Sequence, residues 1–240
     1  METLHLLSVG EGGWGLTLLA AIGTTLALTL VSLMGGAVVG SLVAAAKLSR
    51  RPSLRWVGNT YLVLVRGIPE LLVIYLFYFG GATLVSALGH WLGKEGYVDM
   101  PPFWVGALAV GLLSGAYQAE VYRGAFLAIP RGQLEAALAI GMSPFTRLRR
   151  VLLPQVLGHA LPGLGNVWQM TLKDSSLISV IGLVELMRAS LMAAGSTHQY
   201  FTFYLIGGIG YLLLTGLSGR VFNHAEARVN RTRQRPPIPH

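Results

Sequence analysis

The chain contains no cysteine and few charged residues. Because cysteine is absent from all 240 residues, disulfides, thiolate nucleophiles and cysteine-based metal sites are excluded. Charged residues make up 12% of the chain and hydrophobic residues 53%, whereas soluble domains carry roughly 25% charged residues. Half the usual charge at this length indicates an integral membrane protein.

Motifs of several enzyme classes are also missing. No Gly-Lys-Ser/Thr phosphate loop is present, so the chain cannot hydrolyse ATP by that route, and no Gly-x-Ser-x-Gly nucleophile elbow occurs. The six histidines are scattered and none forms an i,i+4 pair, so the sequence predicts neither a catalytic residue nor a metal site. The N-terminal stretch lacks the basic residues of a cleaved signal peptide, so we expect the first apolar run to remain as a membrane span.

Five apolar stretches are long enough to cross a membrane, since a spanning helix needs roughly 20 mostly apolar residues. They cover residues 16–46, 56–88, 103–126, a run from about 151 past 174, and 200–220. The segment 175–196 is ambiguous, because it is only moderately apolar and either extends the fourth span or lies at the membrane interface. The sequence therefore predicts an all-α membrane protein, with a transmembrane domain over 1–225 and a basic tail over 226–240.

The lysines and arginines predict how the chain is oriented. They gather in three places: Lys47, Arg50, Arg51 and Arg55; Arg131, Arg147, Arg149 and Arg150; and Arg228, Arg231, Arg233 and Arg235. The opposite side has only Lys94 and Arg188. Basic loops stay in the cytoplasm, so we expect the N-terminus outside, and residues 131–150 and the tail inside. The net charge of +8 is divided among separate short loops, which argues against a nucleic-acid partner.

Charged residues within the spans form three close pairs in the sequence. They are Arg66 with Glu70, Glu120 with Arg123, and Lys173 with Asp174. Intramembrane charge is costly and marks either a pair or a function. The simpler interpretation is that the two charges of each pair neutralise each other and stabilise helix packing. Gly67 and Pro69, however, weaken regular helix between Arg66 and Glu70.

The alternative interpretation is a pathway for a cationic solute. At 1.5 Å per residue, Glu70 and Glu120 lie at similar depths, Glu120 about 16 Å from the cytoplasmic boundary. Tyr117 and Gln118 would add hydrogen bonds there. Arg66, Lys173 and Asp174 would then form a gate instead of structural pairs. Both interpretations are open from the residues alone.

The polar segment between the third and fourth spans has clear start and stop signals. Residues 133–140 are good helix formers, and Gly141 is suited to end that helix. Ser143-Pro144 is typical of a new helix start, with serine as N-cap and proline in the first turn. We expect a helix whose exposed face consists of small residues, namely Ala136, Ala137, Ala139 and Gly141. Such a face suits insertion into a partner's groove, with Glu135 available for a charge-assisted bond.

This segment resembles the EAA motif of bacterial ABC importer permeases. The pattern is Glu135-Ala136-Ala137, three intervening residues, Gly141, then Val151 and Leu153-Pro154; the family usually has isoleucine where this chain has Val151. The stretches 66–72, 117–137 and 161–183 resemble the polar amino-acid uptake branch, and specifically the Q-type subunits of histidine/lysine/arginine/ornithine and opine importers. The resemblance covers nearly the whole chain.

The resemblance implies a type I ABC importer fold and a division of labour among subunits. It implies a second permease chain, of M-type or a second copy of this one, together with two ATPases that hold ATP and Mg, a periplasmic binding protein and surrounding lipid, all at the bacterial inner membrane. The ATPases would push on a coupling helix over 132–141, with Gly132, Glu135, Ala136, Ala137 and Gly141 as the coupling residues. The expected function is import of polar amino acids, in particular basic ones. The alternative is a self-contained ion-coupled carrier or channel.

Overall fold

The computed structural model describes residues 6–10, 12–91 and 100–233, and every regular element among these residues is a helix. The principal elements are α2 (Gly15–Leu48), α3 (Pro52–Gly67), α4 (Glu70–Tyr75), η1 (Leu76–Gly80), α5 (Gly81–Trp91), α6 (Pro102–Leu127), α7 (Arg131–Ala139), α8 (Pro144–Arg147), η2 (Leu148–Leu152), α9 (Leu153–Asp174), η3 (Ser175–Ile181), α10 (Leu186–Thr197) and α11 (Tyr200–Arg233). Lys94 and the last residues of the predicted tail lie outside the described residues. The predicted tail boundary at 226 falls inside α11.

The five predicted apolar stretches correspond to helical segments, but they differ in apolarity. Within the described chain, α2 and α11 are by themselves long and apolar enough to cross a membrane, and two bent helix pairs would bring the number to four. The helix of the predicted third span, α6, has 26 residues, which exceeds the roughly 20 needed. Its second half carries Gln118, Glu120 and Arg123. These polar residues are tolerated because half of α6 is buried against other helices.

The centre of the fold is the long contact between α2 and α6, the most extensive helix pair in the described chain. Gly36 and Gly40 of α2 face Gly111 and Gly115 of α6. A Cβ atom on Gly40 would lie 2.9 Å from the carbonyl oxygen of Gly115. Small residues spaced four apart let helices approach closely in lipid.

The predicted second span is broken in the middle. It runs through α3 and then bends by 105° into the segment Glu70–Leu84. Ile68 adopts extended backbone (φ −97°, ψ 136°) and Pro69 follows, so the helical hydrogen-bond ladder stops at Gly67. A proline disfavours helix at the preceding residue, which explains the break.

The ambiguous segment 175–196 consists of two helical pieces. The 3₁₀ helix η3 continues α9 for seven residues and ends at Gly182, which has φ +99°. α10 follows at 49° to the preceding helix. The segment therefore begins as an extension of the fourth helix and then turns into a separate one.

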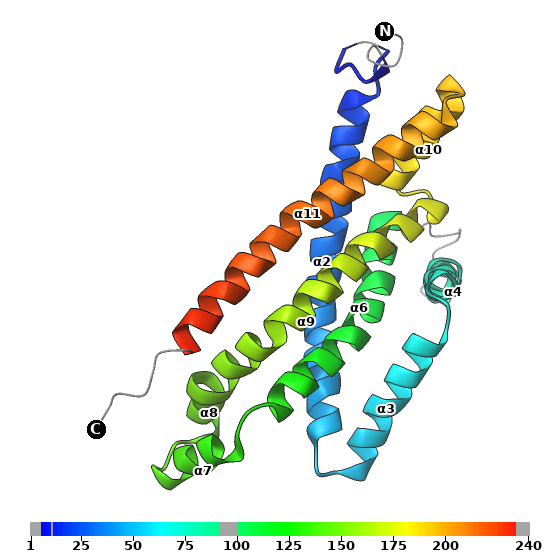
Figure 1. Ribbon diagram of the computed structural model, residues 1–240. Coiled ribbons are helices and arrows are strands. Elements are labelled where there is room, and N and C mark those ends of the chain that lie inside the picture. Colours follow the sequence, from blue (N-terminus) through cyan, green and yellow to red (C-terminus); the bar gives the residue numbers. More distant parts are fainter. Residues whose placement is uncertain (1–5, 11, 92–99, 234–240) are drawn as a thin grey trace.

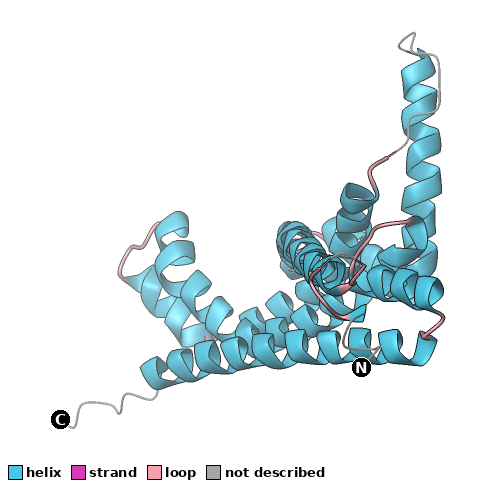
Figure 2. Cartoon of the chain, turned by 90° about the horizontal axis from the view of Figure 1, so that it is seen from above, coloured by secondary structure: helices cyan, strands magenta, loops and turns pink. Residues whose placement is uncertain are grey.

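α3 packs against α2 and α6, α4 contacts α6, and α11 crosses α2 obliquely in the view of Figure 1. The view from above shows a long helix along one edge (Figure 2). The C-terminal end of α2 and the α7–α8 turn lie at the same end of the molecule, opposite the N-terminus (Figure 1). Two of the three predicted cytoplasmic basic segments therefore meet at one end.

Candidate functional site

The break after α3 forms one wall of a polar pocket. The pocket has a volume of 340 Å³ and is lined by Val65, Arg66, Gly67, Ile68, Pro69, Glu70 and Tyr117. The bend therefore brings the Arg66–Glu70 turn of one segment against Tyr117 of α6. Of the sequence-predicted residues, Arg66, Glu70 and Tyr117 meet here.

Arg66 and Glu70 do not form the local pair that helical spacing suggested. No ion pair joins them in the described residues, because the chain is extended at Ile68 and the i,i+4 geometry is lost. The guanidinium carbon of Arg66 instead lies 5.4 Å from the ring centroid of Tyr117, which is within cation–π range. The interpretation as a self-neutralising pair is wrong for these two residues.

Glu70 interacts with two groups on other helices. It lies close enough to the hydroxyl of Tyr117 and the carboxyl of Asp174 to interact electrostatically with both. Asp174 is the last residue of α9. Among the described residues, no ion pair joins it to the neighbouring Lys173, which is exposed. Lys173 nevertheless attracts the Asp174 carboxyl electrostatically, so the local Lys173–Asp174 pair stays a prediction. Two carboxyl groups and one guanidinium gather around Tyr117.

Glu120 occupies a separate, adjoining pocket. Its carboxylate forms ion pairs with Lys47 of α2 and with Arg123, the latter at 2.9 Å, so the predicted Glu120–Arg123 pair is confirmed. The pocket has a volume of 570 Å³ and also contains Asn59 and Arg66. Glu120 therefore already has two cationic partners, unlike Glu70.

Gln118 points away from both pockets. It is buried, and its amide nitrogen donates to the carbonyl of Leu33 at 3.1 Å and to Ser114 at 3.0 Å. Its amide oxygen accepts a hydrogen bond from the Tyr122 hydroxyl at 2.8 Å. The bond to Leu33 joins α2 to α6, and the other two lie within α6, so Gln118 has a packing function in this arrangement.

The segment after α6 folds as its local signals predict. Gly141 has φ +74°, and the amides of Gly141 and Met142 donate to the carbonyls of Leu138 and Ala137. This is the Schellman pattern that ends helices at a left-handed glycine. α8 then begins at Pro144 with Ser143 as its N-cap, whose hydroxyl accepts from the amide of Thr146 at 3.3 Å.

The exposed surface of α7 differs from the predicted one in one residue. Ala137 is buried, with only 4% of its surface exposed, so its expected place on the exposed face is wrong. α7 packs against η2 and thereby has an inward side. Gly132, Glu135, Ala136, Ala139 and Gly141 are exposed. Leu138 and Ile140 are 57% and 71% exposed and add an apolar patch.

Two residues with central contacts were missed by sequence reasoning. Lys47 was interpreted only as an orientation signal, yet it pairs with Glu120 across 73 residues of sequence. Glu185 is fully buried and caps α10, accepting hydrogen bonds from the amides of Met187 and Arg188 and from the Tyr211 hydroxyl. An acidic residue shortly after Gly182 was the available signal for this cap.

The described part of the chain holds no group of three or more histidine, aspartate or glutamate side chains arranged to hold a metal ion. The functional groups that the structure gathers are therefore charged and aromatic side chains between helices, and a surface helix.

Comparisons with known proteins agree with this architecture. Residues 36–231 match the family described as binding-protein-dependent transport system inner membrane component. The chain is 53% identical to the nopaline transport system permease protein NocQ of Agrobacterium fabrum over 229 residues, which are 95% of this chain and 97% of that protein. It is 34% identical to the histidine/lysine/arginine/ornithine transport system permease protein HisQ of Escherichia coli, covering 85% of this chain and 89% of the relative.

A solved structure shares the fold. A chain of an amino acid ABC transporter crystallised with histidines superposes with a TM-score of 0.75 at 30% identity, covering 90% of this chain and 95% of that one. The family match spans most of the chain, and the relatives align almost from end to end. The chain therefore belongs to the inner membrane components of binding-protein-dependent transport systems.

Proposed function

We propose that the chain is a permease subunit that imports a basic amino acid, or a derivative of one, with ATP hydrolysed by separate subunits. The observation that carries the substrate class is the cluster of Glu70, Asp174 and Arg66 around Tyr117. The similar permeases named for nopaline transport and for histidine, lysine, arginine and ornithine transport support the same class.

The chemistry of the cluster suits a solute that carries both signs of charge. Glu70 forms no ion pair among the described residues, and Asp174, which the neighbouring Lys173 attracts, lies close to it, so Glu70 is available to a side-chain cation or an α-ammonium group. Arg66 is exposed at the same pocket and is available to a carboxylate. We propose Glu70, Tyr117 and Asp174 as solute contacts, with Arg66 at the gate. Glu120 has its own partners and is assigned to the neighbouring wall.

We further propose that α7 is the surface on which the ATPases act. Its exposed small residues and the apolar Leu138 and Ile140 fit a groove of a partner, and Glu135 lies exposed beside them. The chain lacks a phosphate loop, so the energy has to come from another chain in this scheme. The proposed assembly contains a second permease, two ATPases and a periplasmic binding protein.

Uptake measurements on the complex reconstituted in vesicles test the substrate class. We expect Glu70→Gln and Asp174→Asn to lower arginine uptake by about tenfold or more, since a hydrogen bond to a charged group contributes about 1.5–3 kcal/mol, and to affect a neutral amino acid less. Glu226→Gln, a partly exposed carboxylate on α11 outside the polar pockets, is the matched control. Equal losses for cationic and neutral solutes would contradict the binding role. Uptake by this chain without any ATPase would instead favour a self-contained carrier.

A further inference from the structure

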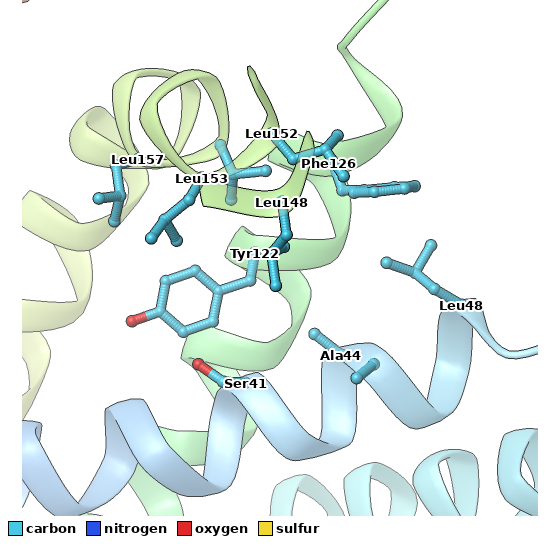
Figure 3. Close-up of a pocket in the computed structure, with 11 residues that line it drawn as sticks. Ser41, Ala44, Leu48, Tyr122, Phe126, Leu148, Leu152, Leu153 and Leu157 are labelled. Carbon is cyan, nitrogen blue, oxygen red and sulfur yellow. The ribbon is translucent and has the colours of Figure 1, made fainter. Parts of the chain in front are cut away.

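An apolar groove opens between α2, α6 and the start of α9, apart from the two polar pockets (Figure 3). Its volume is 410 Å³, within the roughly 300–1,000 Å³ of small-molecule sites. Ala44 and Leu48 line it from α2, and Tyr122 and Phe126 line it from α6. The Tyr122 hydroxyl already donates within the protein, so the groove offers an occupant mainly hydrocarbon contacts.

The third wall carries apolar side chains next to arginines. Leu148 and Leu152, the first and last residues of η2, line the groove, while Arg149 and Arg150 between them are exposed. Arg147 directly precedes this wall. One terminal nitrogen of its guanidinium is buried and has no hydrogen-bond partner in the described chain.

The opposite rim is also basic. Leu48 is the last residue of α2, and the exposed Arg50 and Arg51 follow it. Lys47 is not counted, because it pairs with Glu120. No aspartate or glutamate occurs in residues 48–55 or 140–157. Both rims therefore present positive charge at the point where the apolar lining ends.

We propose that this groove binds an acyl chain of an anionic phospholipid, with the phosphate held by Arg147 and the arginines beside it. The proposal rests on the predicted orientation, which puts both rims at the cytoplasmic headgroups. Basic pockets between membrane helices on that side select anionic lipid headgroups. The apolar lining explains how the acyl chain is held, and the arginines explain the selection for a negatively charged headgroup. An uncharged partner helix would leave the arginines unused.

Photo-crosslinking with lipids tests the proposal. The protein, purified with its partner subunits, is placed in nanodiscs that contain a diazirine-acyl phosphatidylglycerol or the matching phosphatidylcholine, and labelled peptides are mapped by mass spectrometry. We expect the groove peptides to be labelled about fivefold more by phosphatidylglycerol, the contribution of one basic residue near the membrane surface. Arg147→Gln removes this preference, and Arg150→Gln, at an exposed position, lowers it. Arg220→Gln on α11 is the control and leaves the preference intact.

Filling the groove provides an independent measurement. Ala45 lines the groove and is exposed, so Ala45→Phe occupies the space without displacing buried atoms and abolishes labelling by both lipids. Leu42→Phe, also on α2 and 67% exposed but outside the groove, leaves labelling unchanged. Equal labelling of the unsubstituted protein by both lipids overturns the proposal. So does crosslinking from Ala45→Cys, the sole cysteine of its chain, to a second permease subunit.

Discussion

The buried cap at Glu185 is expected to fix α10 in place, and removing it has a cost that can be worked out from its contacts. Its carboxylate accepts from the amide of Met187 at 2.9 Å, from that of Arg188 at 2.8 Å and from the Tyr211 hydroxyl at 2.7 Å. Thr25 of α2 adds a tie, because its hydroxyl oxygen accepts from the amide of Leu186 at 3.1 Å. The cap therefore joins α10 and α11 at a point that also contacts α2.

Glu185→Ala removes both functions of the carboxylate. Loss of an N-cap costs about 0.5–2 kcal/mol, and a buried hydroxyl left without an acceptor costs about 1–3 kcal/mol. Thr25 and Ser175 lie beside the Tyr211 hydroxyl and offer substitute acceptors, which sets the lower end of the range. We expect a loss of about 1.5–5 kcal/mol, which lowers the Tm by roughly 3–20 °C for a domain of this size.

Thermal denaturation of the detergent-purified complex measures this loss, and Tyr211→Phe separates its parts. Tyr211→Phe keeps both amide bonds to Glu185 and should cost only about 0.5–1.5 kcal/mol. The double variant should lose less than the two single losses together, because both remove the same hydroxyl–carboxylate bond. A Tm shift below about 2 °C for Glu185→Ala, or strictly additive losses, would refute the role of the cap.

Three further predictions concern the helix contacts. Gly141→Ala forces an alanine into φ +74° at a cost of about 1–2 kcal/mol, and we expect it to lower the substrate-stimulated ATPase activity of the complex. Gly141→Asn should retain this activity, because asparagine tolerates the left-handed conformation. Equal activity of the two variants would count against a strained cap. Gly40→Val should destabilise the α2–α6 contact by about 1–3 kcal/mol, measured by thermal denaturation. Gly35→Val should have little effect, because a side chain at this position meets open space. Similar Tm shifts for the two variants would contradict the close approach of the helices. Lys47→Met should cost at most about 1 kcal/mol, because Glu120 is partly exposed and keeps Arg123; a larger drop in Tm would mean that the ion pair is shielded from water.

Local signals predicted the parts of the fold that depend on neighbouring residues. Gly141 and Ser143-Pro144 set the end of α7 and the start of α8 as expected, since a left-handed cap and an N-cap are each decided within a few residues. The apolar runs likewise located the long helices, because a membrane span depends on length and composition.

Contacts between distant segments could not be predicted in the same way. The pairing of Lys47 with Glu120 depends on how α2 and α6 are rotated against each other, which hydrophobic periodicity does not specify when a helix is apolar on all sides. Helical spacing was also misleading for Arg66 and Glu70, because Pro69 lies between them and ends the helix. The burial of Ala137 depends on the packing of α7 against η2, a tertiary contact.

The proposed solute pocket lies between the closely packed α2–α6 pair and α3, which contacts α6 less extensively. α2 and α6 are held together by facing glycines, the hydrogen bond from Gln118 to Leu33 and the Glu120 ion pairs. α3 is attached to α6 by fewer polar contacts, chiefly the bond from the Tyr61 hydroxyl to the carbonyl of Leu112 at 2.6 Å and the stacking of Arg66 on Tyr117. Because the proposed solute pocket lies at this second junction, a movement of α3 about the Pro69 break would change the pocket without separating α2 from α6. We therefore expect substrate access to be controlled at the Arg66–Tyr117 contact.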